Sequence, residues 1–227
     1  MKILVVYGTR PEAIKMCPLI LEMKNRPEIE CIVCLSGQHR EMLDQVNGLF
    51  GIKADYDLNI MQESQSLADI TSKVLQGLDH VLNKEKPDVV LVHGDTSTSF
   101  AAAMAAFYNN IPVGHVEAGL RTYNMKSPYP EEFNRQVVDL ICDYYFAPTE
   151  TAKGYLIKEG KDPEEIFVTG NTVIDALKTT VDDSFTDQNI EWAKDSRLIL
   201  LTSHRRENIG ENMEHIFEAI NAIVDEY

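Results

Sequence analysis

The sequence predicts an α/β protein with a doubly wound parallel β-sheet, followed by the beginning of a second domain. Short runs rich in valine and isoleucine alternate with amphipathic helical patterns, which is typical of βαβ units. Hydrophobic residues make up 44% and charged residues 25% of the 227 residues, as expected for a globular protein with a sizeable core. We expect the first domain to span residues 1–170 and the linker and second domain to span residues 171–227.

The first predicted domain alternates strands with helices along the chain. Strands are expected at 3–7, 31–35, 89–93, 113–116, 144–147 and 166–168. Helices are expected at 11–25, 40–50, 67–84, 97–109, 131–141 and 150–159. Pro11 fits the first turn of its helix, because the backbone N–H that proline lacks has no partner there.

The second predicted domain begins after an acidic, polar stretch at 181–196. A helix precedes this stretch and opens at Gly170-Asn171-Thr172, and a strand is expected after it at 198–202. The last helix has an apolar face formed by Ile216, Phe217, Ile220, Ile223, Val224 and Tyr227. One strand and one helix cannot bury this face by themselves, so we expect the chain to contain only the start of a second domain.

The charge balance argues against anionic partners. The chain has 21 lysine and arginine residues against 36 aspartate and glutamate residues, a formal net charge of −15. Such a field repels nucleic acids and anionic membrane surfaces. The apolar start of the chain is too short for a signal peptide, and no run approaches the ~18 apolar residues of a membrane span. We therefore expect a cytoplasmic protein with no nucleic acid or membrane partner.

The cysteines do not indicate a metal or redox site. Cys31 and Cys34 form a C-x-x-C pattern, but they lie in a predicted strand, where residues three apart point to opposite faces. No second cysteine or histidine pair follows at zinc-ligand spacing. The chain also lacks the glycine-rich fingerprint of dinucleotide-binding proteins and the P-loop motif, so we expect no cofactor.

The residues that follow the predicted strands favour an anionic ligand. Parallel sheets bind ligands beyond the carboxyl ends of their strands. Gly8-Thr9-Arg10 leads from the first strand into a helix, with Lys15 one turn further on. A helix N-terminus beside an arginine binds phosphate well, although the same residues also fit an ordinary helix start with solvated cations.

Carboxylates collect at the same predicted edge. Asp95 and Glu117 follow neighbouring strands and are expected about 5 to 10 Å apart, and Glu131 and Glu132 open a later helix. Crowded carboxylates raise each other's pKa values, which produces acid and base pairs for proton transfer. The alternative is that Asp95 caps a helix, and that Glu131 and Glu132 interact with a helix dipole.

The histidines divide into candidate ligand contacts and buried groups. His204 and Arg205 follow the last predicted strand and suit a diphosphate, with the histidine exchanging a proton near neutral pH. His39 lies on a loop after a strand and is a candidate ligand contact. His93 and His115 lie in or at the ends of apolar strands, where a satisfied core or rim histidine is the favoured interpretation.

Five long motifs occur in order along essentially the whole chain: Gly8-Thr9-Arg10-Pro11-Glu12-Ala13-Ile14-Lys15, His93-Gly94-Asp95-Thr96, His115-Val116-Glu117-Ala118-Gly119-Leu120-Arg121-Thr122, Ser127-Pro128-Tyr129-Pro130-Glu131-Glu132-Phe133-Asn134-Arg135 and Thr202-Ser203-His204-Arg205-Arg206-Glu207-Asn208. With these motifs the chain resembles the non-hydrolysing UDP-N-acetylglucosamine 2-epimerases. The resemblance implies a GT-B-like fold, in which two Rossmann-type domains close on a UDP-sugar, and a homodimer. It also implies interconversion of UDP-GlcNAc and UDP-ManNAc, which supplies ManNAc units for surface polysaccharides.

The resemblance further implies a mechanism and residue roles. Enzymes of this family remove the C2 proton and expel UDP, and then return both to invert C2. The catalytic residues would be Asp95, Glu117, Glu131 and His204. The residues near UDP or the sugar would be Arg10, Lys15, Arg135 and Arg205. The order in which the carboxylates take and return the proton stays open.

The chain departs from the family pattern at two places. It ends at Tyr227, before a complete second domain, so we expect it to be inactive by itself. Gln38, His39 and Arg40 match a segment that binds UDP-GlcNAc as an activator in many bacterial members, but Ser64 stands where an arginine is often found.

Three rival functions remain. A related epimerase of a diacetamido-uronic acid is one, and a catalytically silent nucleotide-sugar-binding or interaction module is another. The third is a GT-B glycosyltransferase, which would not need three carboxylates at this edge.

Overall fold

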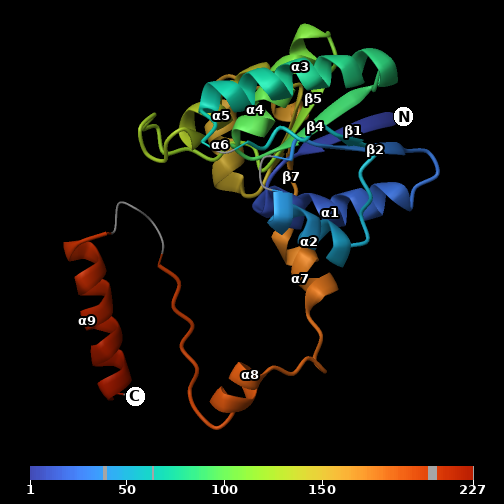
Figure 1. Ribbon diagram of the computed structural model, residues 1–227. Coiled ribbons are helices and arrows are strands. Elements are labelled where there is room, and N and C mark those ends of the chain that lie inside the picture. Colours follow the sequence, from blue (N-terminus) through green and yellow to red (C-terminus); the bar gives the residue numbers. More distant parts are fainter. Residues whose placement is uncertain (38–39, 63, 204–208, 227) are drawn as a thin grey trace. The chain divides into compact units, whose positions relative to one another are not determined.

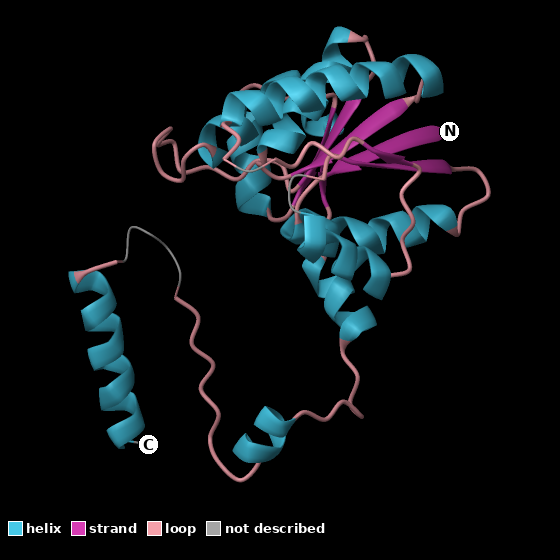
Figure 2. Ribbon diagram, viewed as in Figure 1, coloured by secondary structure: helices cyan, strands magenta, loops and turns pink. Residues whose placement is uncertain are grey.

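A computed structural model describes residues 1–37, 40–62, 64–203 and 209–226 (Figure 1). The chain divides into two compact units, Met1–Val181 and Asp182–Tyr227. The first unit contains a seven-stranded parallel sheet with helices on both faces (Figure 2), which confirms the predicted α/β fold. This unit extends past residue 170 because the next helix packs on the sheet through Ala176. The domain division at residue 170 itself stays a prediction.

The strands lie in the spatial order β3-β2-β1-β4-β5-β6-β7. The direction in which successive strands are added reverses between β1 and β4. In doubly wound sheets, ligands bind beyond the carboxyl ends of the strands at this point. The expected strands of the first unit are all present, and β3 is an additional strand that the sequence patterns did not predict. The strands are β1 (Lys2–Tyr7), β2 (Glu30–Leu35), β3 (Tyr56–Asp57), β4 (Val89–His93), β5 (Val113–Val116), β6 (Tyr144–Ala147) and β7 (Ile166–Val168).

Helices cover the two faces of the sheet as separate layers (Figure 1). One layer contains α3 (Leu67–Glu85), α4 (Ser97–Tyr108), α5 (Glu131–Ile141) and α6 (Glu150–Lys158). The other contains α1 (Arg10–Lys24), α2 (Arg40–Leu49) and α7 (Val173–Thr180). A short 3₁₀ helix, η1 (Pro163–Glu165), precedes β7.

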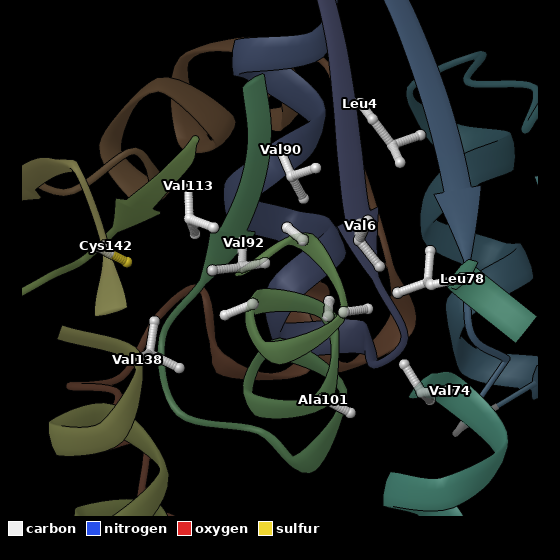
Figure 3. Close-up of a cluster of buried hydrophobic side chains, with 14 of the residues drawn as sticks. Leu4, Val6, Val74, Leu78, Val90, Val92, Ala101, Val113, Val138 and Cys142 are labelled. Atoms are coloured by element: carbon white, nitrogen blue, oxygen red, sulfur yellow. The ribbon is translucent and has the colours of Figure 1, made fainter. Parts of the chain in front are cut away.

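The alternation of side chains along β1 builds a core on each face of the sheet. Leu4 and Val6 point to the layer of α3 and α4, where they join the cluster shown in Figure 3. Ile3 and Val5 point to the opposite layer and pack against α1 and α2. Successive residues of a strand face opposite sides, so an apolar run such as β1 supplies both cores and fixes the carboxyl edge between them.

The second unit contains α8 (Gln188–Ala193) and α9 (Glu211–Glu226). The expectation of a strand at 198–202 is wrong, because these residues adopt no strand conformation and Leu200 is 90% exposed. A strand forms only when a neighbouring strand accepts its backbone hydrogen bonds, and none is present in the described part of this unit. The predicted last helix is present as α9, and none of its residues is buried.

No helix in the described ranges combines the length and the apolar character that a bilayer crossing requires.

Candidate active site

A small cavity of about 80 Å³ lies at the carboxyl edge of the sheet, beside the ends of β4 and β5 and the start of α1. Four of the residues singled out from the sequence line it together: Lys15, Asp95, Glu117 and Arg135. Sequence elements separated by about a hundred residues meet here because the parallel strands all end at the same edge. The cavity is lined by Pro11, Glu12, Lys15, His93, Gly94, Asp95, Thr96, Glu117, Leu120 and Arg135.

Glu117 is an ionised carboxylate held by two cationic or potentially cationic groups. It follows β5 with a left-handed backbone, at φ 69°. The Lys15 ammonium donates a hydrogen bond to Oε2 of Glu117, and Nε2 of His93 lies 2.8 Å from the same oxygen. Burial raises the pKa of Glu117, but the contacts with His93 and Lys15 outweigh burial and lower it to about 2.

Sequence reasoning assigned His93 to the core or the rim, and the structure places it in the cavity wall. His93 is 4% exposed, and neither ring nitrogen has a hydrogen-bond partner among the described residues, so the 2.8 Å approach of Nε2 to Glu117 is an ion-pair contact. Its position directly before Gly94-Asp95 at the end of β4 was the available signal. His93 therefore joins the candidate site as a neighbour of Glu117.

Asp95 has the opposite electrostatic environment. Burial raises the pKa of Asp95, the guanidinium of Arg135 opposes this effect, and the negative charges of Glu131 and Glu117 reinforce it. Nη2 of Arg135 lies 2.8 Å from Oδ2 of Asp95. The alternative that Asp95 caps α4 is wrong, because Thr96 is the cap residue and its hydroxyl accepts the N–H of Ser99.

The two glutamates at the start of α5 have different surroundings. Glu132 is fully buried and accepts hydrogen bonds from the backbone N–H groups of Thr122 and Tyr123 and from the side chain of Gln136, which gives it a structural role. Glu131 is partly exposed and does not line the cavity, but its charge acts on Asp95. Its position in the first turn of α5 also agrees with the helix-dipole interpretation.

The start of α1 carries an exposed cation, and the backbone N–H groups that lead into the helix are already bonded to a carboxylate of the same helix. Arg10 is exposed there, and no carboxylate of the described residues lies within ion-pair distance of it. Buried Glu12 accepts the backbone N–H groups of Gly8 and Thr9 at Oε2. Its Oε1 accepts the hydroxyl groups of Thr96 and Ser99, which ties the start of α1 to the start of α4. Glu12 is a supporting residue that the sequence analysis did not single out.

The remaining candidates lie apart from the cavity or outside the described residues. The Arg40 guanidinium forms ion pairs with two carboxylates, those of Asp44, at 3.1 Å, and Asp57. Gln38, His39, His204 and Arg205 lie outside the described residues. In the described ranges, no group of three or more histidine, cysteine, aspartate or glutamate side chains is arranged to hold a metal ion.

The arrangement is suited to proton transfer beside an anion. Two neighbouring carboxylates have pKa values displaced in opposite directions, downward for Glu117 and upward for Asp95. Such a pair provides one group that stays ionised and one that holds a proton more readily. Lys15 and Arg135 supply positive charge in the same cavity, which a phosphorylated or otherwise anionic substrate requires in a chain of net charge −15.

Comparisons with known proteins identify a family. The family model described as UDP-N-acetylglucosamine 2-epimerase matches residues 21–227. The UDP-N-acetylglucosamine 2-epimerase of Bacillus subtilis is 57% identical over the whole of this chain, which covers 60% of that protein. The chain thus spans about 60% of the length of this relative.

Solved structures agree in fold. The crystal structure of a putative UDP-N-acetylglucosamine 2-epimerase from Listeria monocytogenes matches with a TM-score of 0.93 and 55% identity, over 100% of this chain and 60% of that one. The UDP-GlcNAc 2-epimerase of Neisseria meningitidis bound to UDP-GlcNAc matches with a TM-score of 0.89 and 51% identity, over 100% of this chain and 63% of that one.

Proposed function

We propose that this chain, which belongs to the UDP-N-acetylglucosamine 2-epimerase family, provides the sugar-ring half of a site that interconverts UDP-GlcNAc and UDP-ManNAc. The observation that carries the proposal is the pairing of Asp95 and Glu117 at one cavity, with pKa values displaced in opposite directions. Inversion at C2 needs a group that accepts a proton and a group that donates one.

The reaction we propose balances without any oxidant or cofactor. A carboxylate takes the proton from C2, the electron pair of that C–H bond forms the C1–C2 double bond, and UDP leaves C1 with the pair of the C1–O bond. The product of this first half is 2-acetamidoglucal. UDP then adds back to C1 while a second acid delivers a proton to the opposite face of C2, which gives UDP-ManNAc.

The positive groups around the cavity support the step in which UDP departs. Expulsion of a diphosphate concentrates negative charge, and fixed cations stabilise such charge when they are already in place. Arg10 lies exposed at the N-terminus of α1, where the helix dipole favours a negative charge. We assign substrate contacts to Arg10, Lys15, Arg135 and Arg205.

Further roles follow from the family. Glu131 and His204 complete the proposed catalytic set, and Gln38, His39 and Arg40 form the proposed activator segment. We also propose that the protein works as a homodimer in the cytoplasm. The family names of the relatives favour UDP-GlcNAc over a diacetamido-uronic acid as the sugar.

The 227-residue chain alone is proposed to be inactive, since it spans about 60% of the length of its relatives. The test compares the chain with a chimera in which the uncovered remainder of the Bacillus subtilis relative is joined to it. Each is incubated with UDP-GlcNAc, and anomeric-proton NMR monitors UDP-ManNAc. We expect turnover by the chimera alone. Turnover by the chain refutes its inactivity, and an inactive but folded chimera supports the rival of a silent binding module.

A further inference from the structure

We propose that the buried pair His115 and Asp139 positions the two turns that carry Asp95 and Glu117. Neither residue lines the cavity, and each acts through backbone groups of the turns. His115 lies on β5 and Asp139 lies on the neighbouring α5, and both side chains are buried. The inference rests on the proposed function, because it assigns a positioning role for that reaction.

The first turn is held by His115. Nε2 of His115 lies 2.7 Å from the carbonyl oxygen of Gly94, and a carbonyl only accepts, so Nε2–H is the donor. The N–H of Gly94 donates to the carbonyl of Val116 at 2.9 Å. On the other side, Nδ2 of Asn134 donates to the carbonyl of Asp95 at 2.8 Å. Three hydrogen bonds from β5 and α5 therefore fix the peptide groups of Gly94 and Asp95.

The second turn is held by Asp139. Its Oδ2 accepts the backbone N–H of Gly119 at 3.1 Å, two residues after Glu117. Gly119 has φ 82°, and a Cβ atom there would lie 2.4 Å from the carbonyl oxygen of Ala152. The turn that carries Glu117 thus runs close against α6, and the hydrogen bond to Asp139 fixes its backbone.

The two turns are linked because His115 and Asp139 are bonded to each other. Nδ1 of His115 lies 2.6 Å from Oδ1 of Asp139, and Nη1 of Arg121 lies 2.7 Å from Oδ2. Burial raises the pKa of Asp139, but the contacts with His115 and Arg121 outweigh it and the result lies below the usual range. The Gly94 carbonyl fixes a proton of His115 on Nε2, and Nδ1 of the same ring faces the Asp139 carboxyl group.

The network is closed by Glu159, which lies at the end of α6. The fully buried side chain of Arg121 contacts Oε2 of Glu159 at 2.7 Å, so the guanidinium has a carboxylate partner on two sides. A buried polar network in which every member is paired holds its members rigidly, and loss of one partner leaves the others unsatisfied. The consequence for Asp95 and Glu117 is a fixed separation before substrate binds.

Such positioning affects the rate of the chemical step more than substrate binding. A displacement of about 1 Å of a reacting group costs about 100-fold in rate. His115 and Asp139 touch neither the cavity nor its cations, so KM is expected to stay within about twofold. A purely structural network would lower thermal stability and leave kcat per folded molecule unchanged.

The test uses Asp139→Asn, with Asp143→Asn as the matched control. Asp143 accepts the backbone N–H of Val113 at 2.8 Å, at the end of β5 away from the site. In the chimera defined above, we expect Asp139→Asn to lower kcat about 100-fold per folded molecule, and Asp143→Asn to leave kcat within about twofold. Asn134→Leu, which removes the bond to the Asp95 carbonyl without touching Arg121, is expected to lower kcat about tenfold or more.

A second measurement uses the 227-residue chain and needs no activity. Nitrogen-15 NMR of histidine-labelled chain is expected to show a proton on Nε2 of His115, and a shift of the Nδ1 resonance in Asp139→Asn that is absent in Asp143→Asn. A wild-type His115 without a proton on Nε2 overturns the proposal, as do kcat values of Asp139→Asn and Asn134→Leu within twofold of the parent. An inactive chimera counts against the proposed function instead, and the nitrogen spectrum then decides this proposal.

Discussion

Replacing Lys15 with methionine tests the electrostatic design of the site through the pKa of Glu117. Lys15 and Glu117 are mostly shielded from solvent, with 21% and 15% of their side-chain surfaces exposed. Contacts with His93 and Lys15 lower the pKa of Glu117 from 4.5 to about 2 against the effect of burial. At 1.36 kcal/mol per pKa unit, this displacement corresponds to about 3 kcal/mol in favour of the ionised form in the folded state.

The sign of the effect on stability follows from the direction of this shift. The folded-state pKa of Glu117 lies below the unfolded value, so the stabilisation is fully present above about pH 4.5 and is lost as the pH falls through about 2. Methionine keeps the length of the side chain but removes its charge. Since Lys15 and His93 share the lowering, we expect Lys15→Met to raise the pKa of Glu117 by at least about one unit, or about 1.4 kcal/mol.

The assay is carbon-13 NMR of the Glu117 carboxyl group, titrated in the 227-residue chain. Lys24→Met is the matched control, because Lys24 is an exposed lysine in the last turn of the same helix. It is expected to leave the Glu117 titration in place. A wild-type midpoint near 4.5, or one that Lys15→Met does not move, would refute the reasoning.

Three further predictions concern catalysis, packing and association. In the chimera, Asp95→Asn and Glu117→Gln are each expected to lower kcat about 100-fold or more, which is the scale of general acid–base catalysis. The circular dichroism spectrum should stay unchanged. Near-normal turnover would mean that both residues have a structural role only. Urea unfolding should show that Gly119→Ala lowers the free energy of unfolding by about 3 kcal/mol, because its Cβ would meet the Ala152 carbonyl at 2.4 Å. Gly154→Ala, in the interior of α6 with nothing near its Cβ, should raise this free energy by about 0.5–1 kcal/mol. Equal effects of the two substitutions would contradict the packing. The chain is expected to self-associate through the unburied apolar face of α9, and Phe217→Asp should shift sedimentation towards the monomer.

The sequence predicted the elements that carry a strong apolar pattern and missed those that depend on a partner. Continuous runs such as β1 and β4 are buried on both faces, which makes them visible without knowledge of their neighbours. The strand β3 has only two residues, Tyr56–Asp57, and exists through its pairing with Cys34 and Leu35 of β2. The apolar run at 198–202 shows the converse, since it has the composition of a strand but no neighbour in the described residues.

The candidate site was predictable in its members but not in its electrostatics. Asp95 and Glu117 were found because parallel strands deliver their carboxyl ends to one edge. Their opposite pKa shifts depend on contacts made across the fold, with Arg135 on α5 and Lys15 on α1. His115 looked like an ordinary core histidine because its partner, Asp139, lies 24 residues away on the next helix.

The central claim is that the site exchanges a proton at C2 of the sugar. The most direct measurement is incubation of the chimera with UDP-GlcNAc in D₂O, followed by proton NMR and mass spectrometry of the UDP-ManNAc formed. Removal of the C2 proton by a carboxylate and its return from an exchangeable acid predict product that carries deuterium at C2. UDP-ManNAc that retains the original hydrogen at C2 would contradict the account.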